Sequence, residues 1–268
     1  MEEITRRRDA IEAKRLGQLR GYPLSCPTSY PKINGMVPCA ATMPRAILKQ
    51  SKRIGEAAMN AHDFYSAFVR TARESTLVTK EMLPSFPEVW GTATFLDLYR
   101  NNEPAYTELV NKYIVHKIIK DAEMTPQHEY FRIDTVGWIT RYQEMAEEAH
   151  KLDLSAHLWD LEIAVEHENS EQDWTDEVIK LIHIKCPLKV IISYNYCDER
   201  DTTEWEKLTF IAHWMQEVNA FAKGSDEEYL LIFGNCFNSK SKADYDAFDY
   251  RGYLYNWQTQ RFDRDNVQ

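Results

Sequence analysis

Trp-Asp-Leu-Glu-Ile-Ala-Val-Glu-His-Glu-Asn, residues 159–169, is the stretch of this 268-residue sequence that decides the fold. Side chains of a β-strand alternate between its two faces, so this stretch would have one apolar face and one acidic face. The apolar face would hold Leu161, Ile163 and Val165, and the acidic face Asp160, Glu162, Glu166 and Glu168. Because neighbouring carboxylates repel one another, a compensating cation is expected, and the stretch is a candidate metal site.

The residues that follow indicate a strand, a helix and a second strand. Residues 174–184 have helical spacing, Pro187 ends the helix, and the β-branched run 188–194 is typical of a buried strand. Such a unit joins parallel neighbouring strands by a right-handed crossover. Glu166 and Glu168 would then lie at the carboxyl end of the first strand, where open α/β sheets usually place their sites.

The order of these features resembles the PD-(D/E)XK nuclease superfamily, which includes many restriction endonucleases. Its members carry a carboxylate on one strand, Glu-x-Lys or Glu-x-Glu on the next, and then a helix and an apolar strand. Glu166-His167-Glu168 matches the Glu-x-Glu variant, in which the second acid stands where most members have lysine. The resemblance implies an α/β fold with a restriction-endonuclease-like mixed sheet flanked by helices.

Asp134 lies within a strand-like run, residues 129–139, where an aspartate calls for a metal, a paired arginine or a turn. The resemblance makes Asp134 the metal-binding aspartate on the strand next to Glu166. Asp160 is the alternative, but six residues of strand place it about 20 Å from Glu166, too far to share an ion. A helix-like, charge-rich insertion, residues 142–152, separates the two strands and departs from the superfamily's usual short hairpin.

The helix before the first core strand often brings a glutamate to the metal site in this superfamily. Pro104 opens a predicted helix over residues 105–119, so the resemblance nominates Glu108, with Glu103 second. The alternative for either residue is a solvated carboxylate that the helix dipole favours.

The chemistry that the resemblance implies is magnesium-dependent phosphodiester hydrolysis, with manganese as a substitute. Asp134 and Glu166 would bind the ion, since magnesium needs only one or two carboxylates, and Glu168 would hold or deprotonate the attacking water. Lys180 is the nearest candidate for the missing lysine. Alternatively, Lys180 is an exposed partner of Asp176 and Glu177, one helical turn before it. By alternation His167 faces the apolar side, as a core residue.

The N-terminal region is basic and predicted to be partly helical, over residues 2–20 and 45–73. Residues 13–55 carry eight positive charges and no acid, although the chain's net charge is −10. This segment would either contact phosphates or pack against the acidic remainder of the chain. A proline-punctuated stretch, residues 84–92, marks a boundary between a helical region, 1–92, and an α/β core, 93–268.

Downstream, the pattern continues with an amphipathic helix and two short strands. The helix is predicted over residues 203–223, and the strands over 229–234 and 250–257. The helix residues expected to point inward are Trp205, Leu208, Phe210, Ile211, Trp214, Met215, Val218 and Phe221.

Several classes of protein lack support in the sequence. No run is long and apolar enough for a membrane helix, and residues 1–8 lack a signal-peptide core, so a cytoplasmic protein is expected. P-loop, dinucleotide-binding and hydrolase-elbow motifs are absent, and the five cysteines form neither a zinc nor a disulfide pattern. Two functions remain: a magnesium-dependent endonuclease acting on double-stranded DNA, by analogy a homodimer, or a binding or scaffold protein that keeps the nuclease fold without turnover.

Overall fold

The computed structural model describes residues 59–141, 147, 149–154, 158–170, 173–194, 203–221, 227–234 and 248–265. The chain divides between Lys52 and Arg53 into two compact units, and every described residue belongs to the second. The basic segment 13–55, the helix predicted over 2–20 and part of the insertion predicted over 142–152 lie outside the described residues. Among the described helices, none is long and apolar enough to cross a membrane.

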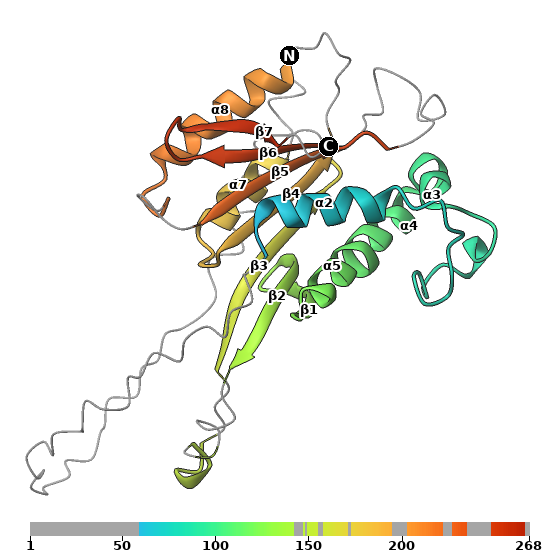
Figure 1. Ribbon diagram of the computed structural model, residues 1–268, viewed down its shortest axis with the longest axis horizontal. Coiled ribbons are helices and arrows are strands. Elements are labelled where there is room, and N and C mark those ends of the chain that lie inside the picture. Colours follow the sequence, from blue (N-terminus) through green and yellow to red (C-terminus); the bar gives the residue numbers. More distant parts are fainter. Residues whose placement is uncertain are drawn as a thin grey trace, which may run out of the picture. The chain divides into compact units, whose positions relative to one another are not determined.

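A seven-stranded mixed sheet forms the centre of the described unit, and its spatial order follows the sequence (Figure 1). Its strands are β1 (Thr125–Tyr130), β2 (Ile133–Arg141), β3 (Leu158–Glu168), β4 (Leu188–Tyr194), β5 (Glu228–Gly234), β6 (Arg251–Asn256) and β7 (Arg261–Asp265). Strands β3, β4 and β5 are parallel to one another, and the other neighbouring pairs are antiparallel. The predicted α/β class and the parallel pairing of β3 with β4 are confirmed.

Helices cover both faces of the sheet. On one face, α7 (Trp174–Ile182) follows β3 and α8 (Thr203–Glu217) follows β4. Both helices pack with Ala164 and Ile191. On the opposite face, Ile163 and Val165 pack in a cluster with helices that precede the sheet. Because both faces are covered, every side chain of β4 is buried, as the apolar sequence of this strand predicts.

The helices that precede the sheet begin at polar caps. They are α2 (Ala61–Ala72), the short 3-10 helix η1 (Pro87–Val89), α3 (Phe95–Asn101), α4 (Glu103–Glu108), the π-helix η2 (Leu109–Ile114) and α5 (Val115–Asp121). Asn60, Thr94 and Asn102 cap α2, α3 and α4, and Pro104 lies in the first turn of α4 as predicted. Since α2 packs in the same cluster as the sheet, contacts continue across the boundary that the sequence places at residue 92.

The single strand predicted over residues 129–139 is wrong, because the chain turns back within it. Strand β1 pairs with β2 through a two-residue turn, Phe131-Arg132, whose φ angles are 51° and 64°. Two-residue hairpin turns favour positive φ, which glycine and asparagine adopt most easily. Neither residue type is present here, so the sequence gives no turn signal. The turn places Asp134 one residue after β2 begins.

The predicted faces of β3 hold only for its second half. Gly137 pairs with Ile163 but Trp138 pairs with Leu161, so the ladder skips Glu162. This irregularity shifts the alternation by one residue. Consequently Leu161 packs with the cluster under α7 and α8, whereas Ile163 and Val165 pack on the other face.

In the C-terminal half, the prediction for part of α8 is wrong and one strand was missed. Trp205, Phe210 and Trp214 of α8 are exposed, whereas Leu208, Ile211 and Met215 are buried as predicted. The aromatic residues fall outside the narrow stripe that faces the sheet. Strand β7 was not predicted, because its sequence, Arg-Phe-Asp-Arg-Asp, has a single apolar residue, the buried Phe262.

Candidate active site

The structure brings Asp134 and Glu166 together across neighbouring strands. Thr135 pairs with Val165 in the antiparallel ladder, which places Asp134 opposite Glu166. The Asp134 backbone N–H donates to Glu166 Oε2 at 3.3 Å, and the His167 backbone N–H donates to Asp134 Oδ2 at 2.9 Å. Each carboxylate is therefore fixed by the backbone of the opposite strand.

Lys180 reaches this pair from α7. Its Nζ lies 2.7 Å from Glu166 Oε1, forms a second ion pair with Glu177, and donates a hydrogen bond to the Arg132 carbonyl at 3.0 Å. Lys180 thus pairs with Glu177, one of the two acids expected as its partners, and also with the nominated metal ligand Glu166, whereas its catalytic role stays a prediction. A single ammonium group connects α7, β3 and the β1–β2 turn.

Burial and charge change the protonation of this cluster. The Glu166 side chain is 2% exposed, and its pKa rises to about 8. Burial is the largest cause, Glu177 and Asp134 add to it, and the hydrogen bond from Lys180 opposes it. Burial alone would lower the pKa of Lys180, but Glu166 and Glu177 raise it. Without a further cation, Glu166 takes up a proton below about pH 8.

Replacing Glu166 with glutamine is expected to flatten the pH dependence of stability. The folded pKa of about 8 exceeds the ordinary value of 4.5, so Glu166 stabilises the fold below pH 4.5 and this contribution is lost as pH rises through 8. At about 1.4 kcal/mol per pKa unit, the loss is on the order of 2–5 kcal/mol. Denaturant unfolding at pH 5 and pH 9, in wild type and Glu166→Gln, measures it. Equal pH dependence in the two proteins would refute the burial of a titrating Glu166.

The other two residues of the Glu-x-Glu triplet, His167 and Glu168, lie in different surroundings. Glu168 Oε1 accepts a hydrogen bond from the Ser170 backbone N–H at 2.7 Å, and within the described residues Glu168 forms no ion pair. His167 is buried, its Nε2 lies 3.0 Å from Tyr194 Oη, and burial lowers its pKa to about 3. His167 is thus a neutral core residue, as the alternation predicts.

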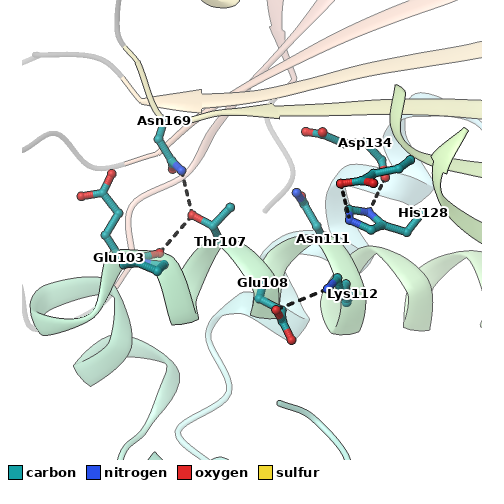
Figure 2. A pocket seen from close by; sticks show the side chains of 10 residues that line it. Glu103, Thr107, Glu108, Asn111, Lys112, His128, Asp134 and Asn169 are labelled. Atoms are coloured by element: carbon teal, nitrogen blue, oxygen red, sulfur yellow. Dashed lines mark hydrogen bonds and ion pairs between the residues drawn. The ribbon is translucent and has the colours of Figure 1, made fainter. Parts of the chain in front are cut away.

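Asp134 also lines a pocket of about 590 Å³ (Figure 2). The pocket is lined by Glu103, Pro104, Thr107, Glu108, Asn111, Lys112, His128, Glu129, Asp134 and Asn169. Both nominated helix glutamates line it, and Glu108 forms an ion pair with Lys112 at 3.3 Å. Asp134 is the residue shared by the pocket and by the contact with Glu166.

The π-helical turn η2 supplies a pocket residue that sequence reasoning missed. Asn111 is 7% exposed, and its Oδ1 has no hydrogen-bond partner among the described residues. Its backbone carbonyl accepts from Thr135 Oγ1 at 3.3 Å, so β2 contributes to holding the irregular turn in place. Figure 2 shows the Asn111 side chain extending from the helix toward the strands. In the same pocket, the Asn169 side-chain amide donates a hydrogen bond to Thr107 Oγ1 at 2.7 Å. No residue pattern in the sequence signals a π-turn.

Asp134 and Glu166 are the two carboxylates that would hold a magnesium ion at this site. Among the residues that the structure describes, no group of three or more His, Cys, Asp or Glu side chains could hold a metal. Magnesium needs only one or two carboxylates and keeps several waters, so Asp134 and Glu166 would suffice. With Glu177 and Lys180 their formal charge is −2 when all four ionise, which a divalent cation would offset.

Comparisons with known proteins add no assignment to this geometry. No family model matches the chain, and no curated protein matches it in sequence. The function of the protein is therefore inferred from the arrangement of Asp134, Glu166 and Lys180.

Proposed function

We propose that the protein is a magnesium-dependent nuclease of the PD-(D/E)XK type that hydrolyses phosphodiester bonds in double-stranded DNA. The observation that carries the proposal is the 2.7 Å contact between Lys180 Nζ and Glu166 Oε1. The Glu-x-Glu triplet lacks the superfamily's lysine, and this contact supplies a lysine at the same carboxylate from α7.

The arrangement of elements supports the same proposal. Asp134 is on β2, the Glu-x-Glu triplet is on the adjacent strand β3, and the next elements are α7 and the buried strand β4. This is the order that the resemblance requires: a carboxylate strand, a Glu-x-Glu strand, a helix and an apolar strand. Helix α4, which precedes the sheet, places Glu103 and Glu108 on the wall of a pocket that includes Asp134.

Each residue has a role that follows from its surroundings. Asp134 and Glu166 would hold the ion, which when bound offsets charge on the phosphate and lowers the pKa of water. Lys180, already beside Glu166, would stabilise the negative charge that develops on the phosphate oxygens. Glu168, at the end of β3, would orient the attacking water. His128 and Asn169 line the adjacent pocket, where His128 Nδ1 lies 2.6 Å from the Asp134 backbone carbonyl oxygen.

Purified full-length protein incubated with supercoiled plasmid tests the proposal. Nicked or linear products are expected with magnesium or manganese, and none with EDTA. The EDTA sample controls for metal-independent contaminating nucleases. Absence of cutting with either metal, across pH 6.5 to 9 and on linear duplexes as well, would contradict the proposal.

A second candidate function is a nuclease-fold binding protein without turnover. It is favoured by one observation: Lys180 and the backbone N–H groups of Asp134 and His167 already interact with the two carboxylates. The acids then need no ion to remain buried. Equal DNA binding with magnesium and with EDTA, together with no cutting, would support this function over the nuclease.

A further inference from the structure

The β1–β2 turn carries an exposed aromatic residue and an exposed cation beside the candidate site. Phe131 is 77% exposed, and Arg132 is exposed and forms no ion pair within the described part of the chain. Both residues have positive φ, which is costly for a bulky side chain such as phenylalanine. A strained turn that presents such residues to solvent suggests a binding role.

Lys180 connects this turn directly to the candidate site. The Lys180 Nζ that lies 2.7 Å from Glu166 Oε1 also donates to the carbonyl of Arg132 at 3.0 Å. Phe131 is the preceding residue, so its ring projects from a backbone that is anchored at the proposed catalytic lysine. The turn backbone is therefore joined through Lys180 to the carboxylate of Glu166.

The Phe131 ring contacts one aromatic neighbour, Tyr130, edge to face. Its centroid lies 4.5 Å from that of Tyr130, with the rings at 80°. Tyr130 in turn lies 6.2 Å from Trp138 and 5.8 Å from Trp159. The four rings form a connected aromatic cluster across β1, β2 and β3, of which Phe131 is the most exposed member.

We propose that the Phe131-Arg132 turn binds an unpaired nucleotide, with the base stacked on the Phe131 ring and its phosphate paired with Arg132. This inference rests on the proposed function and narrows its substrate to double-stranded DNA that also presents an unpaired base to this turn. Stacking on an aromatic ring recognises any base, and a guanidinium matches phosphate geometry. Arg132 provides an exposed positive charge at this turn, although the chain's net charge is −10.

Three variants distinguish an effect of the Phe131 ring on binding from an effect of the turn's backbone conformation. Phe131→Asn removes the ring but tolerates positive φ, and Phe131→Tyr keeps a ring. Phe210→Ala is the matched control, because it removes another exposed ring, on α8. Fluorescence anisotropy with full-length protein in EDTA compares a labelled single strand with the blunt duplex of the same sequence.

Phe131→Asn is expected to weaken binding of the single strand about tenfold and of the duplex less than about twofold. Phe131→Tyr and Phe210→Ala should bind both as wild type does. Unchanged single-strand binding by Phe131→Asn, equal losses on both substrates, or no binding by wild type would overturn the inference. Because the assay needs no cleavage, ring-dependent binding by a protein that never cuts would refute only the nuclease proposal. A cleavage rate that does not change when Phe131 is replaced would refute only the proposed base stacking.

Discussion

Glu166→Gln is expected to lower the rate of magnesium-dependent DNA cleavage by about 1000-fold. Glutamine keeps the shape of the side chain but removes the charge that would bind the ion. It also removes one of the two carboxylate partners of Lys180, whose Nζ lies 2.7 Å from Glu166 Oε1. The measurement is kcat/KM on a duplex substrate at saturating magnesium, in wild type and in the variant.

Glu162→Gln is the matched control for this experiment. Glu162 is also a buried glutamate of β3, but the strand ladder skips it and it lies four residues before Glu166. Its variant should cleave within a few-fold of wild type. If Glu166→Gln cuts as fast as Glu162→Gln, Glu166 does not bind the metal and the assignment of the site is wrong.

Lys180→Met is expected to reduce cleavage about 100-fold and to move the pH–rate profile to higher pH. The hydrogen bond from Lys180 opposes the rise in the Glu166 pKa, so its loss lets that pKa rise further. Because the ion binds the deprotonated carboxylate, activity then requires a higher pH. A pH–rate profile of wild type and of Lys180→Met shows both the lower cleavage rate and the shift to higher pH.

Lys117→Met provides the comparison for a helix lysine in an ordinary ion pair. Lys117 pairs with Asp121 at 2.7 Å on α5, and both side chains are well exposed. Its loss should change neither the cleavage rate nor the pH profile, since exposed pairs contribute little. A slow Lys180→Met enzyme with an unshifted pH profile would contradict the coupling between Lys180 and Glu166.

The elements with strong periodic patterns were predictable from sequence. Strand β4 has the predicted bounds, because a short β-branched apolar run after Pro187 is typical of a buried strand in an α/β chain. The turn at Phe131-Arg132 was not predictable, since neither residue favours positive φ. The exposed aromatic residues of α8, such as Trp214, were misassigned because an aromatic side chain near the apolar stripe resembles a core residue.

The acidic residues of the site could be predicted from the sequence, but the residues around them were harder to predict. Alternation along β3 placed Glu166 on one face and His167 on the other, and the structure agrees. Lys180 could be nominated from its helix, but its contact with Glu166 depends on how α7 crosses the sheet. Asn111 could not be found, because its burial in the pocket depends on the π-turn of η2.

A crystal of the protein soaked in manganese, with anomalous diffraction data, tests the central claim most directly. One anomalous peak is expected within coordination distance of carboxylate oxygens from both Asp134 and Glu166, with Lys180 displaced from Glu166 or sharing it. Binding of manganese elsewhere, with the contact between Lys180 and Glu166 intact, would contradict the claim that these two acids form a metal site.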